Sequence, residues 1–182
     1  MRPAPPDAVL ALVERCQVDD YKHGTDTSEP GRWLVSTPLS IRLTGTWELL
    51  SREDVTQSGE RRIDNALGAD PFGVLIYDGN GHFSAQFMKR VRDGADAGLA
   101  RNAAPNNSRA RDGYDAYFGS YTVDDTQGSV TQTLVGALSR ENVGQVLTRS
   151  MQVDGDELVI RLDTATDDGE AIVRTLRWRR IG

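Results

Sequence analysis

From Leu43 onward, the chain repeats short runs in which apolar and polar residues alternate, and each run ends in a turn. A period of two residues places successive side chains on opposite faces, which is the pattern of a strand with one buried face. Residues 72–77 are almost continuously apolar and indicate a buried strand. The pattern as a whole predicts strands over residues 46–52, 72–77, 82–88, 117–123, 129–136, 145–153, 157–163 and 171–179.

The connectors between these runs are rich in Asp and Gly, which are typical turn residues. The clearest is Asp78-Gly79-Asn80-Gly81, because its residues tolerate a positive φ and favour a tight hairpin. About eight strands with local connections predict an all-β, up-and-down β-barrel, since closing the sheet removes its edges. We expect the barrel domain to span residues 43–182.

Residues 1–42 lack the strand rhythm and are expected to form an N-terminal helical arm. Apolar residues at positions 9, 12, 13 and 16 share one face of a helix expected over residues 8–17. The remainder is polar apart from Trp33-Leu34-Val35. Two placements stay open: the arm is a lid over the barrel mouth, or it packs on the outer wall or on a partner subunit.

One long interruption, Arg90–Asp115, separates the strands. A loop of this length in a compact domain usually has a function, so we expect it to shape the mouth of the barrel. Within it, the sequence Asn106-Asn107-Ser108 predicts the start of a short helix that runs to Tyr114.

Two sequence blocks flank the strand region: Leu43-Thr44-Gly45-Thr46-Trp47 at its start and Leu176-Arg177-Trp178-Arg179-Arg180 at its end. With the blocks at 68–88, 117–121 and 143–145, they make the chain resemble the bacterial and fungal lipocalin-like domain family over residues 43–180. The resemblance implies a calycin-type barrel in which Trp47 plugs one end beneath a cationic side chain. Members of this family are often encoded beside secondary-metabolite genes, and barrels of this type include cyclases. The resemblance itself implies little about activity, and only this association favours chemistry on natural products.

The amino-acid composition limits the classes of partner that we expect for this chain. The 182 residues carry a net charge of −6, and the basic residues are scattered among acidic ones, which argues against a nucleic-acid partner. The apolar stretches fall short of the roughly 18 residues that a membrane span needs, and residues 1–6 lack the apolar core of a signal peptide. A single cysteine, Cys16, forms no intramolecular disulfide. We expect a cytoplasmic protein with no membrane or nucleic-acid partner, and leave a homodimer open.

Cofactor chemistry has little support in the sequence. The only histidines, His23 and His82, do not form a zinc pattern with Cys16, and His82 is expected at a hairpin end rather than in the lumen. The chain contains no nucleophile elbow, phosphate-binding loop or dinucleotide fingerprint. We therefore expect neither a cofactor nor a metal.

The candidate site residues are polar or aromatic side chains within the strands. Hydropathy does not decide which face of residues 84–88 is luminal. We expect Gln86, Tyr121 and Arg149 to be catalytic hydrogen-bond donors. Arg149 also has a structural interpretation, in which it packs over Trp47 or pairs with Glu48 at the barrel end. The expected ligand-binding residues are Trp33, Tyr77, Ser84, Met88, Tyr117 and Gln132.

Two functions follow from these expectations. The first is a cofactor-independent cyclase or isomerase that folds an apolar, polyketide-like intermediate inside the barrel and polarises its carbonyl groups. The second is a binding or carrier protein for a hydrophobic small molecule, which needs only the barrel. A third reading is a barrel filled by its own side chains that acts through oligomerisation.

Overall fold

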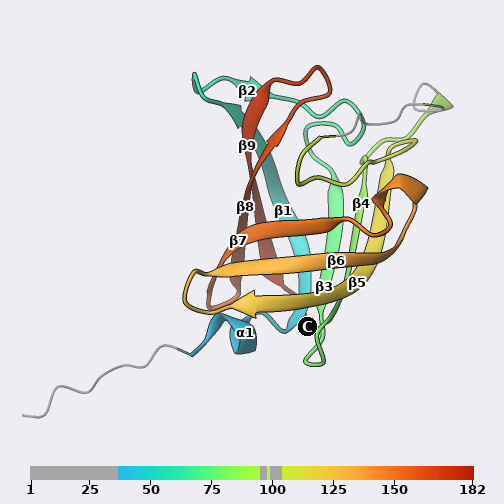
Figure 1. Cartoon of the computed structure of the whole chain (residues 1–182). Helices are drawn as coiled ribbons and strands as arrows, with labels where there is room; N and C mark the ends of the chain where they lie inside the picture. Colours follow the sequence, from blue (N-terminus) through green and yellow to red (C-terminus); the bar gives the residue numbers. More distant parts are fainter. Residues whose placement is uncertain (1–36, 95–97, 99–103) are drawn as a thin grey trace, which may run out of the picture. The chain divides into compact units, whose positions relative to one another are not determined.

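A computed structural model describes residues 37–94, 98 and 104–182 of the chain (Figure 1). The predicted helix at 8–17 and Trp33 lie outside the described residues. A single turn of helix, α1 (Leu39–Arg42), comes first. The strands that follow are β1 (Gly45–Thr56), β2 (Arg61–Arg62), β3 (Phe72–Tyr77), β4 (His82–Met88), β5 (Tyr114–Asp124), β6 (Ser129–Ala137), β7 (Val146–Asp154), β8 (Glu157–Ala165) and β9 (Ala171–Arg180), and the short 3-10 helix η2 (Arg140–Asn142) lies between β6 and β7.

The strands form one antiparallel sheet in the order β2-β1-β3-β4-β5-β6-β7-β8-β9, and β1 also pairs with β9. This last pairing runs from Trp47–Arg180 to Thr56–Ile172 and closes the sheet into a barrel. β2 has only two residues and pairs with the far end of β1, so the barrel wall consists of β1 and β3–β9. The predicted all-β, up-and-down barrel is confirmed.

Alternation along the strands separates the core from the outer wall. On β7, the residues Leu147, Arg149, Met151 and Val153 are buried, while every residue between them is exposed. The same alternation continues around the barrel, and the inward side chains form its core. Adjacent residues on a strand therefore point to opposite faces of the sheet, one toward the core and one toward solvent, as the pleat requires.

β4 shows which of its two faces is luminal. Phe83, Ala85 and Phe87 are buried, whereas Ser84 and Met88 are only partly covered and Gln86 is exposed. The expectation that Ser84, Gln86 and Met88 face the ligand is wrong for this reason. The aromatic face of the strand was the one that closure of the barrel buried.

One end of the barrel is closed by Trp47, which is 0% exposed. Its indole nitrogen donates to the carbonyl of Leu43 at 3.0 Å, and the Arg180 guanidinium lies 4.1 Å from its ring centroid. Arg180 also donates to the carbonyls of Thr44 and Arg42, both at 2.6 Å, which joins the last strand to α1. The predicted Trp plug under a cationic chain is confirmed, and the cation is Arg180.

Gly45 lies at the Trp47 end of the barrel, at a position where a side chain would not fit. Its φ is 145°, and a Cβ there would come within 2.8 Å of the Gly182 carbonyl oxygen and would overlap the Arg180 guanidinium. A larger residue would push the C-terminal strand away from Trp47.

The loop between β4 and β5 differs from its prediction. Residues 104–113 form no helix, and Asn106 and Asp112, with φ values of 53° and 52°, are not in the right-handed helical conformation that the predicted helix needs. β5 instead begins at Tyr114. Among the described residues, no helix is long and apolar enough to cross a membrane.

Candidate functional site

The described part of the β4–β5 loop lies over the barrel end opposite Trp47. We call residues 104–110 the strap. The Asn106 side chain donates to the Thr148 carbonyl at 2.7 Å and accepts from the Thr148 amide at 2.9 Å, as a neighbouring strand would. The Thr164 hydroxyl donates to the Pro105 carbonyl at 2.9 Å. The strap is thereby joined to β7 and β8.

Its second half is joined to β5 and to the β6–β7 connection. The Ser108 hydroxyl donates to Asp115 Oδ2 at 2.6 Å. The Arg109 amide donates to Asn142 Oδ1 at 2.9 Å, and the Asn142 side chain returns a hydrogen bond to the Arg109 carbonyl at 3.2 Å. Hydrogen bonds, rather than a large apolar contact, thus hold most of the strap, although Ala110 is fully buried.

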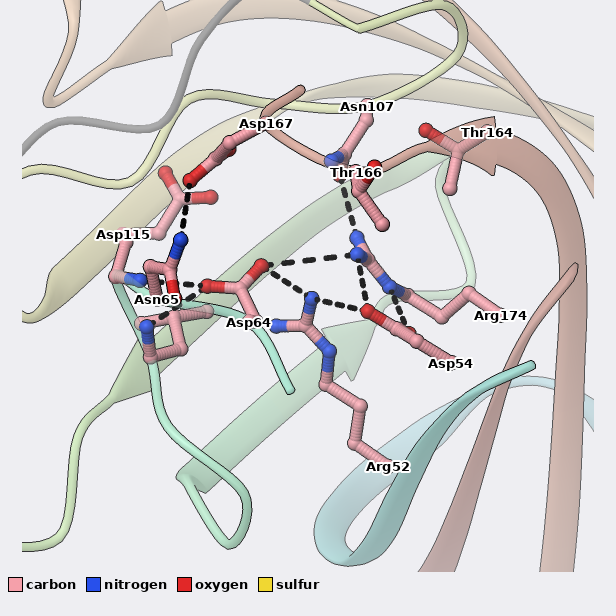
Figure 2. Close-up of polar contacts among 12 residues, drawn as sticks. Arg52, Asp54, Asp64, Asn65, Asn107, Asp115, Thr164, Thr166, Asp167 and Arg174 are labelled. Atoms are coloured by element: carbon pink, nitrogen blue, oxygen red, sulfur yellow. Dashed lines mark hydrogen bonds and ion pairs between the residues drawn. The ribbon is translucent and has the colours of Figure 1, made fainter. Parts of the chain in front are cut away.

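Beneath the strap lies a buried ion-pair network of four residues, Arg52, Asp54, Asp64 and Arg174 (Figure 2). Arg174 donates to both oxygens of Asp54 at 2.7 Å and to Asn107 of the strap at 3.0 Å. Arg52 contacts Asp64 at 2.5 Å and Asp54 at 3.2 Å. All four side chains are at most 5% exposed. Two positive and two negative charges therefore compensate one another here.

The network also sets the protonation of its members. Burial alone would raise the pKa of Asp54, but hydrogen bonds from Arg174 and the charge of Arg52 outweigh it and hold that pKa below its ordinary value. Burial alone would lower the pKa of Arg52, but the charges of Asp64 and Asp54 outweigh it and raise that pKa. Both shifts favour the charged forms of Asp54 and Arg52 at neutral pH.

Arg149 points inward from β7 and is 5% exposed. Its Nη1 donates to the Asn106 carbonyl at 2.6 Å and to the Asn106 side-chain oxygen at 2.5 Å, and its guanidinium also hydrogen-bonds the Tyr117 side chain. Burial lowers the pKa of Arg149, and the neighbouring Tyr117 and Tyr77 act in the opposite direction. Its structural interpretation is wrong, because Arg180 packs over Trp47 and Arg179 pairs with Glu48 at 2.6 Å.

A cavity of about 30 Å³ lies among these groups. This space suits one or two water molecules. Its wall combines apolar side chains, Phe87, Leu67, Leu162 and Leu176, with the polar side chains Arg52, Asn107, Ser108, Asp115, Tyr117, Arg149 and Arg174. A second, larger hollow of about 300 Å³ shares Arg174 with it and is lined mainly by polar residues of 62–65 and 165–168. The cavity under the strap is the one that joins the apolar lumen to polar groups.

The middle of the lumen holds a separate polar contact. Tyr77 is 1% exposed, accepts a hydrogen bond from Gln132 Nε2 at 2.6 Å and donates to the Met151 sulfur at 3.7 Å. Burial raises the pKa of Tyr77, so this phenol stays neutral. Tyr77 and Gln132 therefore are luminal, as expected, but they bond to each other rather than to the cavity.

The structure does not bring the three expected catalytic residues together. Gln86 lies on the outer wall and accepts from the Tyr114 hydroxyl at 2.9 Å. Tyr121 donates to the Asp78 carbonyl at 2.7 Å, near the β3–β4 turn. Only Arg149 lines the cavity, together with Tyr117 of the expected ligand-binding set.

Several residues of this site were missed from the sequence: Arg52, Asp54, Asp64, Asn107, Asp115 and Arg174. A signal for one of them was present. Arg174 shares its strand face with Ile172, Leu176 and Trp178, all of which are buried. A charged residue in a series of inward-facing apolar residues indicates a buried ion pair.

Metal ligands are not grouped in the described residues: no set of three or more His, Cys, Asp or Glu side chains there could hold an ion. His82 lies at the hairpin end, as expected, where its ring nitrogen is 3.1 Å from Asp78.

A known protein family matches most of this chain. The profile of a family described as a lipocalin-like domain matches residues 44–181, which include every strand of the barrel. A barrel of this kind fits the binding of hydrophobic small molecules. A comparison with curated proteins finds no match.

Proposed function

We propose that this chain, which belongs to the lipocalin-like domain family, binds a small, largely apolar molecule in the barrel lumen beneath the strap. The observation that carries the proposal is the composition of the cavity wall. Phe87, Leu162 and Leu176 supply apolar surface, and Tyr117 and Arg149 supply hydrogen-bond donors against it. Ligand sites in proteins typically combine a mainly apolar wall with a few placed polar groups.

The size of the cavity requires the strap to move. About 30 Å³ is far below the roughly 300–1,000 Å³ of a typical small-molecule pocket. The strap is the element to displace, because hydrogen bonds of about 1 kcal/mol each hold most of it, while the strands are joined by continuous ladders. Water can replace those hydrogen bonds when the strap lifts, and the ligand then covers the apolar wall.

A cofactor-independent cyclase or isomerase acting on a polyketide-like molecule is the second candidate. It is supported by the convergence of Tyr117 and Arg149 on one side of the same apolar cavity. Two donors at a fixed position would polarise a carbonyl group of a bound molecule, and the apolar wall would hold its chain folded. Gln86 and Tyr121 have no part in this version, because neither lines the cavity.

A filled-lumen variant tests the binding proposal. Leu162→Phe adds volume at the cavity wall, and Val173→Phe adds it on the outer wall, where Val173 is 43% exposed. Native mass spectrometry and thermal shift would be recorded on the full chain with a panel of apolar carbonyl compounds. We expect ligands to stabilise the wild type and the outer-wall variant but not Leu162→Phe. Equal stabilisation of all three proteins would place binding outside the lumen and contradict the proposal.

Turnover separates the two candidates. Tyr117→Phe keeps the ring and removes the hydroxyl, so a catalyst would lose conversion of a linear precursor while still binding it. Conversion that never exceeds the uncatalysed rate in the wild type, together with ligand release in unchanged form, would leave the binding function alone.

A further inference from the structure

The charges around the cavity do not compensate one another evenly. Arg52 and Arg174 are paired with Asp54 and Asp64 at 2.5 to 3.6 Å. Within residues 37–94, 98 and 104–182, no carboxylate lies within ion-pair distance of Arg149. Its contacts there are with neutral groups, the backbone and amide oxygens of Asn106 and the Tyr117 hydroxyl. Arg149 therefore brings to the cavity wall a positive charge that no carboxylate contacts directly.

Such a charge is unusual in a core. An arginine guanidinium remains protonated, and burying it without a negative partner is costly. Arg149 is only 5% exposed, so water does little to compensate it. An anionic group bound beside Arg149 would supply the direct ion pair that this guanidinium lacks.

A second observation points to the same ligand chemistry. Arg52 also lines the cavity, and its Nε is buried with no hydrogen-bond acceptor among the described residues. Two guanidinium groups on one wall, one lacking a carboxylate and the other lacking an acceptor at Nε, favour an occupant rich in acceptor oxygens.

Asp115 acts in the opposite sense and limits where an anion can lie. It is 1% exposed, lines the same cavity, and accepts the Ser108 hydroxyl at 2.6 Å. Asp115 lies two residues before Tyr117 on the same inward face of β5. Its carboxylate would repel an anionic group, so the group must lie toward Arg149.

We infer that the ligand is an amphiphile with a carboxylate or comparable oxyanion head, received by Arg149 and Tyr117, and with an apolar body against Phe87, Leu162 and Leu176. This inference rests on the proposed binding function. A cavity of about 30 Å³ is of the size of a carboxylate group, so the head fits the space present, and the body takes the place of the strap.

The test compares dodecanoate with its methyl ester, which has the same body and no charge. Calorimetric titration of the full-length wild type should show dodecanoate binding at least about tenfold tighter than the ester, as expected for a charge-assisted hydrogen bond. Arg149→Gln should remove this preference, so that dodecanoate and its ester bind with affinities within about twofold of each other. Arg161→Gln, an exposed arginine on β8, is the matched control and should keep the preference.

Asp115→Asn provides an independent arm, since Arg149→Gln also changes a buried hydrogen-bonded group. Removing the negative charge should increase the preference for dodecanoate by about tenfold. If Arg149→Gln does not unfold cooperatively, this variant decides: an unchanged preference in Asp115→Asn overturns the inference.

The outcomes also distinguish a failure of the anionic-head inference from a failure of the proposed binding function. Equal affinity of the wild type for dodecanoate and its ester overturns the anionic head and leaves the binding function intact. Loss of the preference in Arg161→Gln as well as in Arg149→Gln assigns it to general surface charge and overturns the inference. Binding of neither compound, nor of any neutral apolar probe, contradicts the proposed function itself.

Discussion

Asp54→Asn tests whether the buried ion-pair network holds the strap end of the barrel. Asp54 accepts two hydrogen bonds from Arg174 at 2.7 Å and one from Arg52 at 3.2 Å, at 4% side-chain exposure. The substitution keeps the shape but removes the charge and one acceptor oxygen. Two buried arginines would then share Asp64 alone, and one positive charge would lack a partner.

Breaking a buried pair by removing one partner typically costs 3–5 kcal/mol. Because the amide oxygen can still accept one hydrogen bond, we expect a loss of about 3 kcal/mol in the free energy of unfolding. Urea denaturation followed by tryptophan fluorescence measures it. With a urea dependence of about 1–3 kcal/mol per molar, the midpoint should fall by about 1–3 M.

An exposed pair supplies the matched control. Glu53 contacts Arg61 at 2.5 Å, but these side chains are 43% and 77% exposed. Glu53→Gln should therefore change the free energy of unfolding by less than about 1 kcal/mol. Equal effects of the two substitutions, or a loss below about 1 kcal/mol for Asp54→Asn, would refute the view that the buried network stabilises the fold.

The same carboxyl predicts a dependence on pH. The folded-state pKa of Asp54 lies below the unfolded value of about 3.9, so folding binds fewer protons at this site. Its contribution to stability is present above about pH 4 and is lost as the pH falls through the folded pKa. The difference in unfolding free energy between wild type and Asp54→Asn should thus shrink on acidification below that point, as equilibrium unfolding across pH would show. A constant difference would contradict the reasoning.

Four further substitutions have distinct expected outcomes. Gly119→Ala should destabilise strongly, because the added Cβ overlaps a backbone carbonyl of β6, whereas Gly79→Ala, with open space around it, should cost under about 1 kcal/mol in thermal unfolding. Arg180→Met should lower the free energy of unfolding by about 2 kcal/mol, since it removes the cation over Trp47 and two hydrogen bonds to backbone carbonyls. Tyr121→Phe should cost about 1 kcal/mol of stability and leave ligand affinity unchanged, because this hydroxyl bonds to a backbone carbonyl away from the cavity; a large loss of affinity would restore it as a site residue.

The sequence predicted the strands and their order because these depend on local signals. Alternation with a period of two residues can be detected within a few residues of sequence. The Asp-Gly turn at 78–81 joins two strands, β3 and β4, that are neighbours both in sequence and in the sheet. The Trp47 plug at the closed end was also predictable from the sequence, because Trp47 and the cationic cluster at 177–180 lie on the two strands that pair when the barrel closes.

The sequence did not predict which face of β4 points into the lumen. Phe83, Ala85 and Phe87 alternate with Ser84, Gln86 and Met88, and a ligand-binding lumen accepts either set. The pairing of β4 with β3 and β5 decides the question, because it turns the aromatic set toward the core of the closed barrel. A shift of one residue would have exchanged the two faces.

The candidate site depended on tertiary structure most of all. Arg174 is 120 residues from Asp54 in the chain, and no local pattern predicts that their side chains meet. The strap has no periodicity, and its positive φ at Asn106 follows from contacts with β7 rather than from neighbouring residues. The sequence by itself determined the barrel, since alternation is a property of each strand. Only the tertiary structure decided which cation packs over Trp47, which cation lines the cavity, and how small the cavity is. These properties depend on how side chains from many strands fill one volume.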